Sequence, residues 1–367
     1  MELAARVWEF VVRPVDRFLF GITMVIVVVG LVTLFSAADQ SVDRLRTQLA
    51  SLAVALVAMW VVANIPPQTL ARTAVPLYVM AVVLLIGVAL FGIVVNGSRR
   101  WLNLGITRIQ PSELAKIAVP LMLAWYFQKF EGRIGWKDFV FAAVLIAVPA
   151  VLIKRQPDLG TALMITASGF YVLFLAGLSW KIIAGLGAVA AAAAPLAWNL
   201  LHDYQRRRIL TFIDPAQDPL GAGYHSAQAS IAIGSGGVVG KGWLNGTQTH
   251  LDFLPERHTD FIFAAYSEEF GLVGNLALIA AFILLIFRGL AIAANATTLF
   301  SRLLAGAVTM IFFTYAFVNM GMVSGILPVV GVPLPFISYG GTAMVTLGLG
   351  LGILMSIARA RKLAAQN

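Results

Sequence analysis

The chain has 367 residues, of which 60% are hydrophobic and only 12% are charged. Soluble domains carry charge on roughly a quarter of their residues, so this composition excludes a soluble globular protein and predicts an integral membrane protein. Cysteine is absent, which excludes disulfides, thiolate-bound metals and a thiol nucleophile. The net charge of +9 favours anionic lipid head groups or a diphosphate over nucleic acid as partners.

Windows of about 20 residues predict ten membrane-spanning helices, and therefore an all-α membrane fold. The N-terminal segment is charged and lacks the apolar core of a signal peptide, so the first span is expected to be retained. No repeat or low-complexity linker divides the chain, so residues 1–367 are expected to form one membrane domain. The predicted spans are 17–37, 47–63, 73–95, 111–130, 137–153, 159–177, 181–200, 262–288, 302–326 and 339–358.

Basic residues around the short loops predict the orientation in the membrane. They are more frequent on the side that holds both termini, which predicts that both termini lie in the cytoplasm. The outer side is also basic, because Arg99, Arg100, Lys154 and Arg155 lie in its short loops. An outer face of this kind is suited to holding a polyanion.

The connection between the seventh and eighth spans, residues 202–261, is long and contains all four histidines. Loops beyond about 12–15 residues are usually functional or disordered. Aromatic residues that can pack, and glycine-rich turns such as 234–237 and 240–242, argue against disorder. We expect a partly helical extracytoplasmic cap against the membrane, with a basic run at Arg206, Arg207 and Arg208.

Asp260 stands where this loop enters the eighth span. Desolvation there would raise the pKa of its carboxyl group, and cationic Arg257 and His258 would lower it again. A carboxylate tuned in this way can act as a general base toward a sugar hydroxyl. The structural alternative is that Thr259 or Asp260 simply caps the helix.

Glu268 and Glu269 follow two turns later, roughly 12 Å deeper at about 1.5 Å per residue. Buried acids are costly unless they face a polar interior. A structural polar network is favoured over a cation or proton pathway.

Glu113 and Lys116 open the fourth span three residues apart, so they share a helix face and can pair. The pair either neutralises the helix start or presents the lysine to a diphosphate. Arg100 and Trp101 precede it on the outer side, where an aromatic belt alone would explain the tryptophan.

Asp158 precedes the sixth span and is a candidate helix cap or a partner for basic residues or a divalent cation. A single carboxylate does not define a metal site. Pro328, Pro333, Pro335 and Gly340–Gly341 predict an irregular stretch that lines a cavity before the last span. No nucleotide-binding glycine loop or zinc-spaced histidine pair is present, which argues against ATP-driven transport.

Four motifs, in order along nearly the whole chain, resemble the SEDS (shape, elongation, division and sporulation) family. Arg257 before His258 is similar to the elongation branch, which serves rod shape, more than to the division branch. The resemblance implies a ten-span fold. The motifs are Gln110-Pro-Ser-Glu-Leu-Ala-Lys116, Gln156-Pro-Asp-Leu-Gly-Thr161, Phe253-Leu-Pro-Glu-Arg-His-Thr-Asp-Phe-Ile-Phe-Ala264 and Pro335-Phe-Ile-Ser-Tyr-Gly-Gly341.

The resemblance also implies a peptidoglycan glycosyltransferase that polymerises lipid II at the outer face of the cytoplasmic (inner) membrane. Lipid II is a disaccharide pentapeptide linked to undecaprenyl diphosphate, and the implied partner is a class B penicillin-binding protein that supplies the transpeptidase. The family's essential aspartate maps onto Asp260, and its other polar positions map onto Glu113, Lys116 and Asp158, with Arg100 and Trp101.

Under this hypothesis Asp260 takes the proton of the acceptor hydroxyl, and cations stabilise the departing diphosphate. No cofactor is assigned, and a divalent cation, Mg²⁺ or Mn²⁺, is left open. A lipid II flippase and a non-catalytic scaffold for the transpeptidase are the alternatives; the concentration of ionisable residues on the outer side favours the transferase. The substrate-binding candidates are Lys116, Glu113, Arg100, Trp101, Asp158, Lys154, Arg155, Arg207, Arg208 and His258.

Overall fold

A computed structural model describes residues 14–95, 98–103, 108–156, 158–200, 206, 210–211, 222–251, 253–254 and 256–364. Two of the predicted substrate-binding residues, Arg207 and Arg208, lie outside the described residues.

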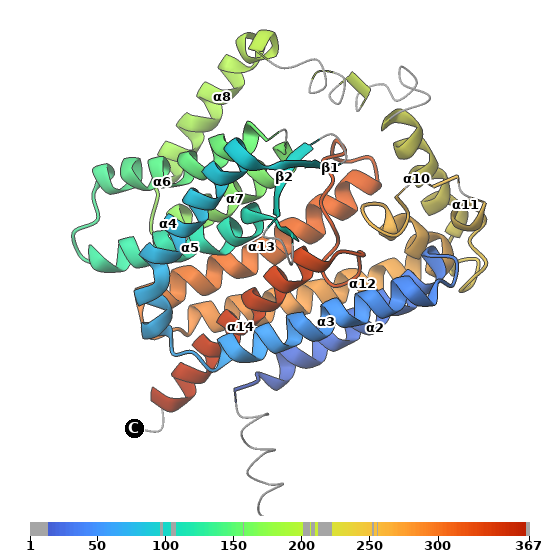
Figure 1. Ribbon diagram of the computed structural model, residues 1–367, viewed down its shortest axis with the longest axis horizontal. Coiled ribbons are helices and arrows are strands. Elements are labelled where there is room, and N and C mark those ends of the chain that lie inside the picture. Colours follow the sequence, from blue (N-terminus) through green and yellow to red (C-terminus); the bar gives the residue numbers. More distant parts are fainter. Residues whose placement is uncertain are drawn as a thin grey trace, which may run out of the picture.

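Among the described residues, ten long helices account for the ten predicted spans, and Figure 1 shows their arrangement. Seven of them are long and apolar enough to cross a membrane, and α7 and α8 are shorter apolar helices. The prediction of an all-α, multi-pass membrane fold is therefore confirmed. The ten are α2 (Arg17–Ala37), α3 (Val42–Ala63), α4 (Pro67–Phe91), α5 (Pro111–Lys129), α6 (Trp136–Lys154), α7 (Leu159–Leu175), α8 (Trp180–Leu200), α12 (Ile262–Ala294), α13 (Leu299–Val323) and α14 (Gly341–Ala364).

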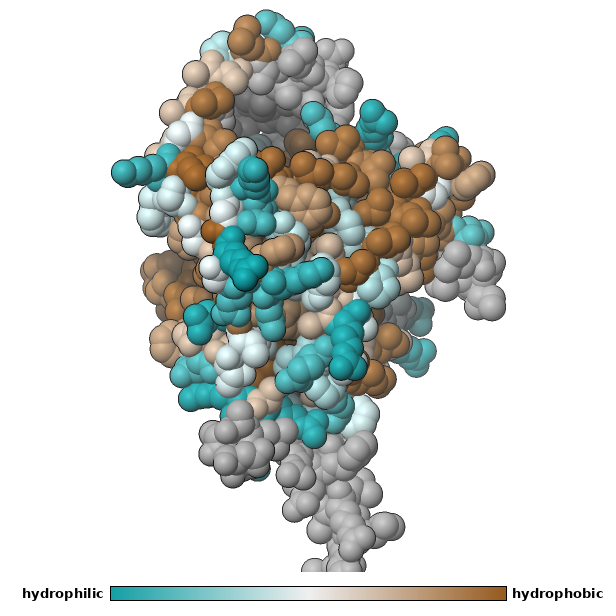
Figure 2. Space-filling model, turned by 90° about the vertical axis from the view of Figure 1, so that its left-hand side faces the viewer, coloured by the Kyte–Doolittle hydropathy of each residue, from teal (hydrophilic) through white to brown (hydrophobic). Residues whose placement is uncertain are grey.

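The bundle buries α5 and α13 at its centre and exposes apolar side chains at its perimeter. Most residues of α13 are buried, including Phe312 and Tyr315. By contrast, α2 exposes Val25 and Val28 at 57% and 58% of their surface. A helix that presents valines outward is suited to lipid. Figure 2 shows the end of the bundle that carries the end of α14, where hydrophilic side chains gather between hydrophobic flanks.

The beginning of α2 lies at the same end of the bundle as the end of α14 (Figure 1). Asp16 caps α2 by accepting a hydrogen bond from the Leu19 N–H at 3.1 Å. Arg288 of α12 donates to the same carboxylate at 2.5 Å. Burial alone would raise the pKa of Asp16, but the hydrogen bonds from Arg288 and Leu19 outweigh it and lower the pKa.

A small antiparallel sheet, which the sequence analysis did not predict, joins α4 to α5. It contains β1 (Ile93–Val95), β2 (Ser98–Asn103) and β3 (Arg108–Ile109) in that order. Ile93 pairs with Trp101, and Leu102 pairs with Ile109. The predicted span 73–95 was therefore too long at its end, because its last three apolar residues form a strand rather than helix.

The long connection is partly helical in its described part, as predicted, with α10 (Ala222–Gly236) and α11 (Thr247–His250). Its segment 237–242 packs against a break in α12 at Gly271, where φ is 63° and ψ is −162°. A break of this kind leaves backbone groups without helical partners. The segment satisfies four of these groups through hydrogen bonds of 3.0 Å each. The bonds run from Lys241 N to Glu268 O, from Gly242 N to Glu269 O, from Leu272 N to Gly237 O and from Val273 N to Val238 O.

The break at Gly271 lies directly after Glu268 and Glu269. The two glutamates end a short helical segment that Gly271 separates from the rest of α12. Both carboxylates contact the long connection, through Lys241 and Leu244. The predicted depth of roughly 12 Å below Asp260 stays a prediction.

Candidate active site

Asp260 lies in a turn before α12. The N–H groups of Thr259 and Phe261 both donate to the carbonyl of Glu256, at 3.0 and 3.2 Å. The N-cap residue of α12 is Phe261, without a side-chain cap hydrogen bond, and the Thr259 hydroxyl donates to Glu256. The helix-cap interpretation of Thr259 or Asp260 is therefore wrong, because the turn places the helix start two residues after Asp260.

Hydrogen bonds to main-chain carbonyls hold this turn against the bundle. Asn319 of α13 donates from Nδ2 to the Asp260 carbonyl at 2.8 Å. The Ser338 hydroxyl donates to the Thr259 carbonyl at 2.7 Å, and the Tyr339 N–H donates to the His258 carbonyl at 2.9 Å. These three contacts fix the backbone of the turn, and the Asp260 side chain is half-buried beside it.

The carboxylate of Asp260 lies over Gly331, in the irregular segment between α13 and α14. Gly331 has a φ of +72°, and a Cβ atom placed there would lie 3.2 Å from Asp260 Oδ2. Glycine therefore provides both the left-handed backbone and the space beside the carboxylate. The predicted irregular stretch before the last span is confirmed, and it forms one wall of the site.

Lys116 and Glu113 pair as their spacing predicted, with 2.7 Å between Lys116 Nζ and Glu113 Oε1. The ammonium group also donates to the hydroxyl of Tyr315 on α13 at 2.5 Å. Only 6% of the lysine side chain and 12% of the glutamate side chain are exposed. No hydrogen-bond partner for Glu113 Oε2 occurs among the described residues.

Helix α13 brings Lys116 and Asp260 together. Tyr315 and Asn319 are four residues apart on this helix, so they share one face with their Cβ atoms about 5–6 Å apart. Lys116 contacts the first of them and the Asp260 carbonyl accepts from the second. The buried ammonium group and the Asp260 turn therefore lie beside adjacent turns of α13. The sequence analysis missed Tyr315 and Asn319, although polar residues four apart in an apolar span were a usable signal.

Asp158 combines two of its predicted roles. Its Oδ1 accepts a hydrogen bond from the Thr161 N–H at 3.0 Å, which caps α7. Its Oδ2 lies 3.5 Å from Nε of Arg100, which β2 carries to this point. The next residue of β2, Trp101, is half-buried. The sheet, which was not predicted, therefore positions both Arg100 and Trp101, two of the predicted substrate-binding residues.

The start of α7 reaches the same irregular segment that lies beneath Asp260. A Cβ atom at Gly160 would lie 2.7 Å from the carbonyl oxygen of Val330, so the two backbones are in contact. Asn319 donates to the carbonyl of Val332 at 2.7 Å. Residues 330–332 thus connect the Asp158 cap, the Asp260 carboxylate and α13 into one region.

The other candidates are placed less centrally. Lys154 and Arg155 are exposed at the end of α6, and the ionic partner of Asp158 is Arg100 rather than either of them. Arg206 donates to the carbonyls of Trp198 and Asn199 at the end of α8.

His258 is half-buried, with its ring centroid 5.9 Å from that of Tyr339. Burial lowers the pKa of its imidazole, and the nearby guanidinium groups of Arg44 and Arg257 lower it further against the opposing charges of Glu256 and Asp39. The imidazole beside Asp260 is therefore neutral at pH 7.

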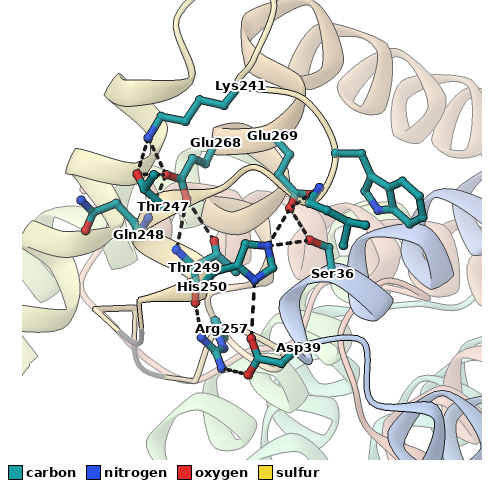
Figure 3. Close-up of polar contacts among 12 residues, drawn as sticks. Ser36, Asp39, Lys241, Thr247, Gln248, Thr249, His250, Arg257, Glu268 and Glu269 are labelled. Carbon is teal, nitrogen blue, oxygen red and sulfur yellow. Dashed lines mark hydrogen bonds and ion pairs between the residues drawn. The ribbon is translucent and has the colours of Figure 1, made fainter.

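Glu268 lies outside this region, in a polar network between α11 and α12 (Figure 3). Its fully buried carboxylate accepts from Lys241 Nζ at 2.7 Å and from the main-chain N–H groups of Gln248 and Thr249 at 2.9 and 3.2 Å. The predicted structural network is confirmed by these contacts, which tie the long connection to α12.

Glu269 extends the network to the C-terminal end of α2. Its Oε1 accepts from the hydroxyl of Ser36 and from the Leu244 N–H, and lies 3.8 Å from Nε2 of His250 (Figure 3). The opposite ring nitrogen of His250 lies 3.5 Å from Asp39. Two adjacent glutamates therefore hold three segments that are far apart in the sequence.

A resident divalent cation does not fit the donor set at the site. In the part of the chain that the structure describes, no group of three or more His, Asp or Glu side chains has an arrangement that could hold a metal ion. Glu113 and Asp158 are each already paired with a cationic side chain. We therefore derive no chemical step through a metal ion.

The fold and the site define a multi-pass helical membrane protein with an ionisable site between its helices. The FtsW/RodA/SpoVE family model, described as a cell cycle protein, matches residues 15–363. The chain belongs to this family, the SEDS family that its motifs predicted.

Two solved structures and one curated relative support this placement. The chain is 50% identical over 353 residues to the peptidoglycan glycosyltransferase MrdB of Escherichia coli K12, covering 96% of this chain and 95% of that protein. It matches the rod shape determining protein RodA of Thermus thermophilus with a TM-score of 0.71 and 30% identity, covering 94% of this chain and 97% of that one. It matches a chain of a peptidoglycan synthase complex, studied for the coordination of polymerization and crosslinking, with a TM-score of 0.83 and 32% identity, covering 94% and 98%. The predicted similarity to the rod-shape branch is confirmed.

Proposed function

We propose that this protein is a peptidoglycan glycosyltransferase that polymerises lipid II into glycan strands for cell-wall elongation. The observation that carries the proposal is that α13 holds the Asp260 turn through Asn319 and the buried ammonium group of Lys116 through Tyr315, one helical turn apart. Similarity to MrdB, which bears the name of this activity, over 96% of the chain supports the same reaction.

In the proposed reaction Asp260 accepts the proton of the GlcNAc 4-hydroxyl of an acceptor lipid II. The oxygen attacks the anomeric carbon of MurNAc at the end of the growing strand, with inversion. The bond from that carbon to undecaprenyl diphosphate breaks, and the diphosphate leaves with the bonding electron pair. His258, two residues before the base, is neutral at pH 7 and adds no charge to the turn.

Cations at the site act where negative charge develops. Lys116 is buried, so its charge is screened little by water and stabilises a leaving diphosphate strongly. Arg100, held at the site by Asp158, is the second candidate. Lys154 and Arg155 are exposed at the rim and are suited to attracting the anionic substrate rather than to the chemical step.

We place the site on the extracytoplasmic face of the cytoplasmic membrane and both termini in the cytoplasm. The distribution of Lys and Arg supports this orientation, and the start of α2 and the end of α14 share one end of the bundle. The class B penicillin-binding protein is the proposed partner, supported by the likeness to a chain of a synthase complex that couples polymerization to crosslinking.

The test is reconstitution of the full chain with lipid II and the partner, comparing wild type with Asp260→Asn. General-base catalysis contributes about 10²- to 10⁴-fold, so polymer formation should fall by that factor. Asp43→Asn is the matched control, because Asp43 is an exposed carboxylate that pairs with Arg46 at 3.7 Å.

Both variants should assemble with the partner and melt at the wild-type temperature. Unimpaired polymer from Asp260→Asn would contradict its assignment as the base. Translocation of lipid II without polymer would replace the transferase with a flippase, and no activity in wild type beyond stimulation of the transpeptidase would support a scaffold.

A further inference from the structure

An ion pair joins the end of α2 to the turn that carries Asp260. Arg257 donates to Oδ2 of Asp39 through one guanidinium nitrogen, and to the carbonyl of Thr249 through the other (Figure 3). Arg257 is 8% exposed, whereas 52% of the Asp39 side chain is exposed. The guanidinium group therefore connects α2, α11 and the turn three residues before Asp260.

The backbone is in the left-handed region on both sides of this ion pair. Asp39 and Gln40 have φ values of 52° and 58°, and Glu256, next to Arg257, has a φ of 49°. Non-glycine residues in this region are destabilising and persist where the surrounding structure imposes them. The pair is thus formed between two strained turns rather than between two relaxed surface side chains.

The strained turn at Glu256 is the same turn that positions Asp260. The Glu256 carbonyl accepts the N–H groups of Thr259 and Phe261, so a shift at Arg257 moves residues 256–261 together. On the bundle side, Asn319 and Ser338 hold this turn through its carbonyls. On the opposite side, the contacts of Arg257 with Asp39 and Thr249 hold it.

We propose that Asp39 is a positioning residue for the glycosyl transfer, which acts through Arg257 to set the place of the Asp260 carboxylate. The inference rests on the proposed function, because it concerns the base of that reaction. Asp39 does not touch substrate in this proposal. It fixes the outer side of the Asp260 turn, so its effect falls on catalysis more than on substrate binding.

The magnitude follows from the sensitivity of positioned catalysts to distance. A misplacement of about 1 Å costs about 10²-fold in rate. Asp39→Asn is nearly isosteric and asparagine tolerates a left-handed backbone, so this change removes the charge and leaves the turn. Arg257→Lys keeps the charge but cannot reach two acceptors with a planar fork. We expect both variants to lower kcat about 10- to 100-fold.

The experiment measures kcat and KM for lipid II, the stoichiometry of lipid II binding and the melting temperature, with the full chain and its partner. Asp43→Asn, four residues further along the chain from Asp39, is the control and should behave as wild type. The proposal requires a lower kcat with KM within about threefold, unchanged stoichiometry and unchanged melting temperature. Asp39→Glu, which restores the carboxylate, should recover part of the lost rate.

Three results would overturn the inference. These are an Asp39→Asn variant as active as Asp43→Asn, a rate loss matched by a loss of binding sites, and a rate loss matched by a lower melting temperature. The last two would make Asp39 a structural residue only. Failure of wild type to form polymer would instead refute the proposed function, so the two failures are distinguishable.

Discussion

Replacing Gly271 with alanine should be strongly destabilising, because the added Cβ atom would raise the free energy of the folded state in three separate ways. The backbone there, with φ 63° and ψ −162°, lies in a region that is almost exclusive to glycine, and a side chain in it costs about 1–3 kcal/mol. The new Cβ would lie 2.3 Å from Gly240 N and 2.8 Å from Val238 O. Overpacking of this kind costs about 1–3 kcal/mol more.

The variant also strains the four hydrogen bonds that join segment 237–242 to the break in α12. The backbone and overpacking costs alone sum to about 2–6 kcal/mol, a large part of the stability of an ordinary domain. The assay is unfolding of the purified chain in detergent, followed by intrinsic tryptophan fluorescence against denaturant.

Gly21→Ala is the matched control. Gly21 lies in α2, and an added Cβ would meet no other described segment within 4 Å, so alanine should leave stability unchanged or raise it by up to about 1 kcal/mol. If Gly271→Ala and Gly21→Ala unfold at the same denaturant concentration, the argument from backbone conformation and contact is refuted.

Tyr315→Phe removes one of the two hydrogen-bond partners of buried Lys116, so it should lower stability by about 1.5–3 kcal/mol in the same unfolding assay. Tyr171→Phe breaks only a neutral hydrogen bond to Thr314 and should cost about 0.5–1.5 kcal/mol; an equal or smaller loss in Tyr315→Phe would argue against a buried charge at Lys116. Burial holds the pKa of His258 below its ordinary 6.5, so the unfolded chain binds this proton more readily. Acidification from about pH 7.5 to about pH 5.5 should therefore lower the melting temperature of wild type more than that of His258→Gln, and equal decreases would contradict the lowered pKa.

The spans were predictable because bilayer thickness dictates their length. Each crossing needs about 20 apolar residues, and α2, α3 and α14 satisfy that condition within a few residues of the predicted limits. The same criterion failed at 93–95, where Ile-Val-Val is apolar enough to extend a span. The β-branched side chains of Ile and Val favour strands, but hydropathy alone does not distinguish an apolar strand from the end of an apolar helix.

Local pairs in the site were also predictable, since spacing alone fixes them. Glu113 and Lys116 are one helical turn apart, and Asp158 directly precedes a helix. Contacts between distant segments were not predictable. Tyr315 lies 199 residues from its partner Lys116, and Asp39 lies 218 residues from its partner Arg257. No local sequence pattern indicates which segment each of these side chains contacts.

The break at Gly271 illustrates the same limit for the backbone. A single glycine inside an apolar run is compatible with a continuous membrane helix. Its left-handed conformation depends on a segment about 30 residues earlier that supplies matching hydrogen bonds. The sequence contains both parts, but their pairing arises only in the folded chain.

The position of α5 has a consequence for how the chain enters the membrane during synthesis. This helix is absent from the seven that are long and apolar enough to span alone, and it carries Glu113 and Lys116 near its start. A charged residue at the centre of an isolated helix disfavours insertion by about 2.5–3.5 kcal/mol, and the cost is smaller but still unfavourable near the helix start, where these two residues lie. The ion pair and the neighbouring helices offset that cost only once they are present. Helix α5 is therefore expected to enter the bilayer together with α4, and the Tyr315 hydroxyl reaches Lys116 only after α13 has been made, so the site is completed late in biogenesis.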